Sequence, residues 1–216
     1  AHASNVAVVL QACTTLSFLA AAAGNRVPLV RDGAHTAVMA AARTHSDDER
    51  VTECAMRALL CLAAADDNRV PLVRDGVHTA VMAAARAHAS NVEVVQQACT
   101  MLSFMSTAAD NRVPLVRDGA HTAVMAAART QSGEVEVVRI ACSMLSNLLY
   151  VADNCVPLLR DGAHAAAIAA ARTHAGDVEV ARAACLVLSN LSAAADNCVP
   201  LVRDGAHAAV MVAARA

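Results

Sequence analysis

The chain has 216 residues, of which 57% are hydrophobic and only 1% aromatic, and its 17 basic and 19 acidic residues give a net charge of −2. Because phosphate binding needs a basic stripe and no block of like charge occurs, this composition argues against nucleic acid as the main partner. A core of small aliphatic side chains favours an all-helical protein, since Ala is the best helix former and small residues let helices approach closely.

The first 25 residues carry no charge and could be taken for a signal or membrane segment. There is no basic leader, however, and Gln11, Thr14 and Ser17 interrupt the apolar run with polar groups. The matching segments later in the chain carry Glu93 and Glu136. We therefore expect a soluble helix here and no membrane partner. Because the sequence opens directly inside a repeat, we expect a piece of a longer array.

The motif N-x-V-P-L-x-R-D-G recurs five times at a constant step of 43 residues, with no insertion. A fixed period of this length is the signature of a solenoid, in which each unit packs only on its neighbours. We expect a single domain whose function lies on a surface that the repeats build jointly. Its five repeats are predicted at about 1–43, 44–86, 87–129, 130–172 and 173–216.

The last repeat shows the predicted helices most clearly. Val178, Cys185 and Leu188 follow a three- and four-residue spacing, which predicts a long amphipathic helix. Asp177 suits the N-cap of this helix, because its carboxylate can accept from the free N–H groups of the first turn. The equivalent N-cap residues in the other repeats are Asn5, Asp48, Asn91 and Glu134.

A short helix is predicted to begin at Asp196-Asn197, with Pro200 in its first turn, where a missing N–H costs nothing. Gly205 should end it in a left-handed backbone conformation. A medium helix is predicted at about 206–214. Each repeat is therefore expected to contain a long, a short and a medium helix.

The sequences L-S-N-L and D-N-x-V-P-L-V-R-D-G-A resemble the armadillo repeat, whose third helix ends in A-L-x-N-L and whose first helix ends at a similar glycine. The resemblance covers the whole chain and implies a right-handed, all-α solenoid with three helices per repeat and five repeats in permuted register. The long helix corresponds to the third helix of the family. The other helical repeat of this length, HEAT, has two helices and lacks the short one.

In armadillo proteins such as importin-α and β-catenin, the third helices line a concave groove that binds an extended peptide. The resemblance implies that the Asn of A-L-x-N-L holds the peptide backbone, since an amide can both donate and accept a hydrogen bond. We call this position of the long helices the Asn row. It reads Phe18, Cys61, Phe104, Asn147 and Asn190.

Only two members of the Asn row match the family. Importin-like members of the family have Trp one helical turn before this Asn. This chain contains no Trp, and the residues at that position include Thr14, Arg57 and Ser143. This departure argues against stacking of lysine stems between indoles and leaves generic groove binding. Phe18 and Phe104 either anchor a partner, since aromatic residues are enriched at binding hot spots, or pack between neighbouring helices.

Eleven residues before the Asn row lie Glu93, Glu136 and Glu179, on the same side of the long helices because eleven residues are close to three turns. Three carboxylates in register would favour a basic partner segment. Acidic residues also collect in first turns to suit the helix dipole, and this second interpretation is the simpler one.

Four of the eight cysteines, Cys13, Cys99, Cys142 and Cys185, share a position at which the second repeat has Met56. Stacked repeats place equivalent residues roughly 10 Å apart, too far for a disulfide. Cys155 and Cys198 are also one repeat apart. We therefore expect reduced, buried thiols and a cytoplasmic or nuclear protein.

The nine histidines form two sets at equivalent positions, one of which contains His35, His121 and His164. Residues one repeat apart cannot converge on one metal ion, so we interpret them as polar residues near helix ends and expect no metal or cofactor. The Arg of each R-D-G is expected to interact with the carbonyl groups at a helix end. No phosphate loop, G-x-S-x-G or unique Cys–His pair occurs, which argues against an enzyme.

The sequence therefore predicts a non-enzymatic module that binds an extended segment of another protein along the long helices. The alternative is a structural piece of a larger assembly with no free groove. Neither end of the sequence has the polar cap that solenoids need, because the first repeat begins V-A-V-V-L and the last ends V-M-V-A-A-R-A. We therefore also expect head-to-tail self-association.

Overall fold

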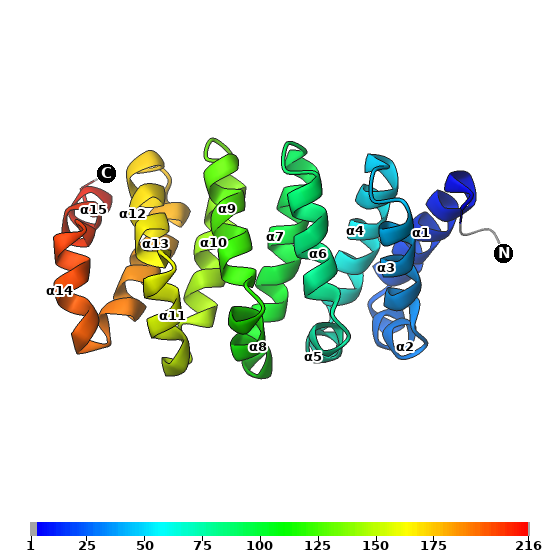
Figure 1. The fold of residues 1–216 in the computed structure, drawn as a ribbon, viewed down its shortest axis with the longest axis horizontal. Helices are drawn as coiled ribbons and strands as arrows, with labels where there is room; N and C mark the ends of the chain where they lie inside the picture. The colour runs from blue at the N-terminus through cyan, green and yellow to red at the C-terminus, as the bar shows by residue number, and fades with distance from the viewer. Residues whose placement is uncertain (1–3, 216) are drawn as a thin grey trace. The chain divides into compact units, whose positions relative to one another are not determined.

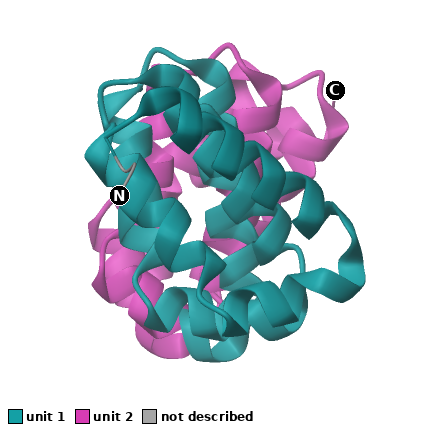
Figure 2. Cartoon of the chain, turned by 90° about the vertical axis from the view of Figure 1, so that its right-hand side faces the viewer, with its two compact units in different colours: residues 1–111 teal, residues 112–216 magenta. Residues whose placement is uncertain are grey.

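The computed structural model describes residues 4–215, which form helices and connecting turns without a β-strand. The all-α prediction is confirmed. The chain divides into two compact units, residues 1–111 and residues 112–216, which Figure 2 shows in teal and magenta. Each unit is described by itself.

Unit 1 contains three long helices and the shorter helices between them. In Figure 1, α3 and α6 form one layer of this unit and the long helices α1, α4 and α7 form a second layer behind it. Its elements are α1 (Val6–Ala21), the 3₁₀ helix η1 (Ala23–Asn25), α2 (Arg26–Arg31), α3 (Ala34–Thr44), α4 (Glu49–Ala63), α5 (Asp66–Arg74), α6 (Val77–Ala87), α7 (Val92–Thr107) and the 3₁₀ helix η2 (Ala109–Asn111).

Unit 2 repeats this two-layer arrangement. The medium helices α9, α12 and α15 form one layer, and the long helices α10 and α13 lie behind them (Figure 1). Its elements are α8 (Arg112–Arg117), α9 (Ala120–Thr130), α10 (Val135–Leu148), the 3₁₀ helix η3 (Ala152–Asn154), α11 (Cys155–Arg160), α12 (Ala163–Thr173), α13 (Val178–Ser192), α14 (Ala195–Arg203) and α15 (Ala206–Ala213).

The N-caps of the long helices follow the sequence prediction in four of five repeats. Asp177 accepts a hydrogen bond from the backbone N–H of Val180, and Asn5, Asp48 and Asn91 cap α1, α4 and α7 in the same way. Glu134 occupies the N-cap of α10 but makes no side-chain cap hydrogen bond. A capping side chain supplies an acceptor to an N–H group that has no partner within the helix.

The short helices end at glycines in the left-handed conformation, as predicted. The φ angles of Gly76 and Gly205 are 78° and 89°, a region that other residues rarely adopt. Pro200 does not lie in the first turn, because α14 begins at Ala195 and so includes the turn before Asn197. The medium helix that follows ends at Ala213, one residue earlier than predicted.

A buried asparagine connects successive short helices within each unit. The side-chain amide of Asn68 donates to the carbonyl of Leu62 in its own repeat (2.9 Å) and to that of Arg26 in the preceding repeat (3.0 Å). In unit 2, Asn154 donates in the same way to Leu148 (2.8 Å) and Arg112 (3.3 Å). Both N–H groups of a buried amide are thus used, which fixes the register between neighbouring repeats.

Candidate functional site: the exposed face of the long helices

In unit 1, the Asn row places side chains of mixed character on one face of the long helices. Phe18 of α1 is exposed, while Cys61 of α4 and Phe104 of α7 are half-buried. Since Phe18 is largely in water, packing between helices does not account for it. Phe104 has a partner within the unit, because the guanidinium of Arg69 lies 5.8 Å from its ring centroid.

The other predicted residues of unit 1 form a charged pair across two helices. Arg57 of α4 and Glu93 of α7 are both exposed, and a guanidinium nitrogen of Arg57 lies 3.9 Å from a carboxylate oxygen of Glu93. The same oxygen accepts a hydrogen bond from the side-chain amide of Gln97 at 3.0 Å. Glu93 therefore already lies beside an arginine of the same unit.

In unit 2, the two asparagines of the Asn row lie on neighbouring long helices and are half-buried. The amide nitrogen of Asn190 in α13 lies 3.3 Å from the hydroxyl of Ser146 and 3.4 Å from its carbonyl oxygen, so it donates to α10. Asn147 of α10 also has a partner. The side-chain carbonyl oxygen of Asn190 accepts no hydrogen bond from the described residues and can accept one from a ligand.

Ser143 and the two remaining glutamates bind residues of their own helix. The hydroxyl of Ser143 donates to the carbonyl of Arg139, one turn earlier (2.9 Å). Arg139 in turn donates to both carboxylate oxygens of Glu136, at 2.8 and 2.5 Å, and holds the pKa of that carboxyl below its ordinary value. Glu179 accepts from Arg182 at 2.7 Å. Each glutamate of this set therefore lies beside an arginine, which weakens the argument for a basic partner.

A second aromatic contact, which the repeat pattern does not predict, lies just after the end of α10. The guanidinium of Arg112, at the start of α8, lies 5.4 Å from the ring centroid of Tyr150, which is exposed. Arg112 and Arg69 occupy equivalent positions, so an arginine is stacked on an aromatic ring near the end of a long helix in each unit. An exposed ring with a stacked arginine offers a flat surface to a peptide side chain.

The histidines are not simply polar residues near helix ends. His35, at the start of α3, is buried, and its Nε2 lies 3.1 Å from a carboxylate oxygen of Asp75, at the end of α5 in the next repeat. In unit 2, His121 pairs with Asp161 at 2.9 Å and His164 with Asp204 at 3.1 Å. We call each such contact a His–Asp rung.

The arginine before each rung aspartate binds the same carboxylate. The Nε of Arg160 donates to Asp161 at 2.8 Å, and Arg74 donates to Asp75 at 3.1 Å. These arginines lie in the last turn of the short helices, where a cation near the helix-end carbonyls was expected, and their side chains donate to the adjacent carboxylate, which is a stronger acceptor than a carbonyl. Hydrogen bonds from Arg160 and then His121 lower the pKa of Asp161 to about 2.

This lowered pKa predicts an acid-dependent loss of stability. Because the pKa of Asp161 is lower in the folded than in the unfolded protein, its ionised carboxylate stabilises the fold. This contribution is complete at pH values above the ordinary pKa of 3.8 and is lost as the pH falls through about 2. In urea unfolding between pH 7 and pH 2, Asp161→Asn should therefore flatten the dependence of unfolding free energy on pH below about 4. Asp153→Asn, which removes an exposed carboxylate outside the rungs, should keep the steeper dependence; equal slopes for the two variants would contradict the prediction.

The cysteines that share a position with Met56 lie in the core in three of four cases. Cys13, Cys99 and Cys142 are buried, and burial raises the pKa of the Cys99 and Cys142 thiols to about 12. Such thiols are not activated nucleophiles. The expectation of buried thiols is wrong for Cys198, which is exposed, and Cys155 and Cys185 are only half-buried.

Within residues 4–215, no group of three His, Cys, Asp or Glu side chains is arranged to hold a metal ion. No single helix in this range is long and apolar enough to cross a membrane; the helical segments Val6–Ala21 and Ala23–Arg31 meet the criterion of length and composition together, but they are bent by 111°. Comparison with models of known protein families and with curated protein sequences finds no match for this chain.

Proposed function

We propose that the chain is a non-enzymatic, armadillo-like interaction module that binds an extended segment of another protein along the Asn row. The observation that carries the proposal is the exposure of this row. Every member is exposed or half-buried, whereas the core of the long helices on either side of it is closely packed. Solvent-reachable aromatic and amide side chains on successive helices are groups that bind peptides.

The spacing of the long helices suits an extended segment. Packed helices lie about 8–10 Å apart, and an extended chain rises about 3.3 Å per residue. Every third residue of the segment would therefore meet the next long helix. In unit 2, the free side-chain carbonyl of Asn190 would accept a backbone N–H of such a segment. Unit 1, taken by itself, offers Phe18 and Phe104 for contact with apolar side chains.

A double replacement tests the role of the amides. Asn147→Ala with Asn190→Ala should weaken binding of a peptide selected from a random library on the intact chain, by about tenfold, because each lost hydrogen bond is worth about 0.5–1.5 kcal/mol. Binding would be measured by fluorescence anisotropy. Thr173→Ala, at the exposed end of α12 in the other helix layer, is the control and should leave affinity unchanged.

Unchanged affinity of the double variant would remove the asparagines from the site. A parallel Phe18→Ala variant would then separate two cases. A loss of binding would place the site on unit 1, and unchanged binding in both variants would refute binding along the Asn row.

A second candidate function is a structural piece of a larger assembly. Exposed apolar residues on α1 and on α14 and α15 favour it, since such patches mark protein interfaces. This role does not need the Asn row, so it would survive the loss of peptide binding.

A further inference from the structure

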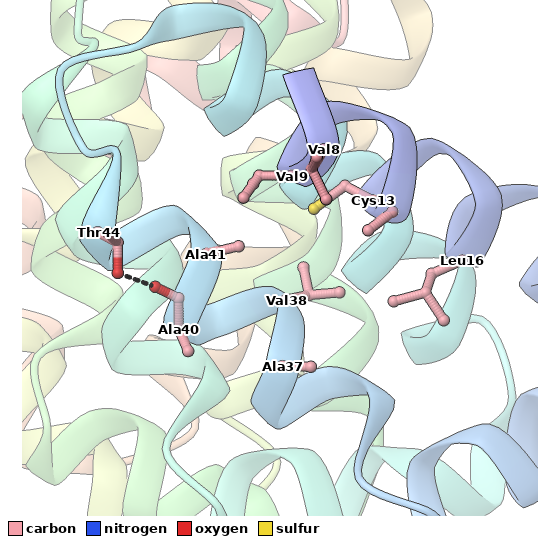
Figure 3. Close-up of a pocket in the computed structure, with 10 residues that line it drawn as sticks. Val8, Val9, Cys13, Leu16, Ala37, Val38, Ala40, Ala41 and Thr44 are labelled. Carbon is pink, nitrogen blue, oxygen red and sulfur yellow. Dashed lines mark hydrogen bonds between the residues drawn. The ribbon is translucent and has the colours of Figure 1, made fainter. Parts of the chain in front are cut away.

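Helix α1 exposes apolar residues whose equivalents in the next repeat are fully buried. Val8 is 46% exposed, whereas Val51, at the same position of α4, is 0% exposed. The difference arises because α4 packs on α1, α2 and α3, and no equivalent helices precede α1 among the described residues. A hollow of about 260 Å³ lies between α1 and α3 and is lined in part by Val8 and Leu16. Figure 3 shows these side chains facing it. We call this surface the head face.

A second apolar surface lies on the last repeat. Met211 of α15 is 47% exposed, whereas Ile168, at the same position of α12, is 6% exposed because α13 and α15 pack on α12. Val202 of α14 and Val210 of α15 are also exposed. Together with α13, these helices enclose a mostly apolar hollow of about 590 Å³. We call this surface the tail face.

Inside unit 2, the surface that corresponds to the tail face is formed by α10 and α12 and is covered by a helix of the next repeat. The head face carries the same apolar side chains as that covering helix. That helix is α13, which packs on α10 and α12. Helices α1 and α13 are identical at four positions where α13 is buried and α1 is more exposed, and α1 carries no charge that would lose hydration on burial. The four pairs are Val8 and Val180, Ala12 and Ala184, Leu16 and Leu188, and Leu19 and Leu191.

Two polar groups continue the same pattern. His207 occupies the position of the rung histidines but is exposed, and it pairs with no aspartate of the described residues. Conversely, Asp32 occupies the position of the rung aspartates, and its side chain is 68% exposed against 24% for Asp161. The histidine of the last repeat and the aspartate of the first repeat could therefore form one further His–Asp rung between two copies of the chain.

The side chain of Asn25 likewise lacks a hydrogen bond that its equivalents make to a backbone carbonyl of the neighbouring repeat. Its equivalents Asn68 and Asn154 each donate one hydrogen bond within their repeat and one to the preceding repeat. Asn25 makes the first bond, to Leu19 at 3.0 Å, and within residues 4–215 its side chain makes no second bond of this kind. By the same geometry, its acceptor in a stacked repeat would be the carbonyl of Cys198.

We propose that the head face of one copy of this chain docks on the tail face of a second copy and reproduces the repeat–repeat contact seen within each unit. In this junction α1 covers α13 and α15, His207 pairs with Asp32 of the second copy, and Asn25 donates to the backbone of the tail. The contact is heterologous, so a pair of chains keeps one free head and one free tail. The proposal is independent of peptide binding along the Asn row.

The test uses the mass of the intact chain in solution. Multi-angle light scattering over a dilution series should show the wild type rise above its monomer mass of 22.2 kDa as concentration increases. Val8→Glu and Met211→Glu should each weaken association by about 100-fold or more, because a charge would be buried without a partner. Val156→Glu alters a residue that is exposed at every equivalent position and should associate like the wild type.

Mixing the two variants identifies the faces. Val8→Glu keeps an intact tail and Met211→Glu an intact head, so their mixture should form a complex of one copy of each and stop there. His207→Ala should weaken wild-type association several-fold through loss of the rung, with an unchanged circular dichroism spectrum. A wild type that stays monomeric at every concentration, association that survives either glutamate, or variants that do not combine would each overturn the proposal.

Discussion

Replacing Asn68 with Ala is expected to lower the free energy of unfolding by about 2–4 kcal/mol. Asn68 is 1% exposed, and its amide supplies the hydrogen bonds to two carbonyls, those of Leu62 and Arg26. Truncation removes both bonds from a largely buried site and leaves the Leu62 carbonyl only a long bond from the N–H of Ala65 (3.4 Å), and a poorly satisfied buried acceptor costs about 1–3 kcal/mol. Urea unfolding followed by circular dichroism would measure the change.

Asn25→Ala is the matched control for this variant. Asn25 has the same position in the first repeat, but it is exposed and makes one hydrogen bond, to Leu19. Water can replace that bond, so the expected loss is below about 1 kcal/mol. Equal losses in the two variants would show that the contact between repeats contributes nothing to stability.

Replacing Leu62 with Ala is expected to cost about 2–5 kcal/mol of unfolding free energy. Leu62 lies in α4 and is 1% exposed, so the truncation removes buried methyl groups and leaves a cavity. Surrounding helices fill such a cavity only partly, and the lost contacts add to the lost transfer free energy. Thermal and urea unfolding at low protein concentration would measure the effect.

Leu19→Ala makes the same chemical change at the same repeat position of α1, where the side chain is 45% exposed. Its expected cost is about 1 kcal/mol or less, because much of the side chain is already in water. Since Leu19 belongs to the head face, the same variant should weaken self-association. A cost equal to that of Leu62→Ala in dilute solution would mean that α1 is covered in the monomer.

Several local features could be predicted because they depend on residues close in sequence. The helix boundaries at Asp177 and Gly205 follow from a side chain that accepts from the next turn and from a backbone angle that glycine adopts freely. The position of Pro200 could not be predicted in the same way. The turn before the proline has the same sequence, A-D-N-C-V-P-L, in both repeats, yet it is 3₁₀ in η3 and part of the α-helix in α14, so the local sequence does not decide between them.

The candidate site could be predicted only as a row of residue types. Spacing placed Phe18 and Asn190 on one face of the long helices, and the structure leaves both in contact with solvent. The hydrogen-bond and ion-pair partners of the site residues could not be predicted from the sequence. Asn190 donates to Ser146, which is 44 residues away, and Glu93 lies beside Arg57, on the preceding long helix. Whether side chains on stacked helices meet depends on rotamers and helix separation, neither of which the period of 43 specifies.

The sequence by itself determined the all-helical composition, the period and the capping and turn residues, because each of these arises from interactions within one or two helical turns. Only the tertiary structure decided which of five equivalent residues is buried. Val8 and Val51 are the same residue at the same repeat position, yet they differ in exposure because, among the described residues, α4 packs on the helices of a preceding repeat and α1 does not. The tertiary structure likewise joined His121 to Asp161, since a buried imidazole takes the acceptor that the stacking of repeats brings within 3 Å.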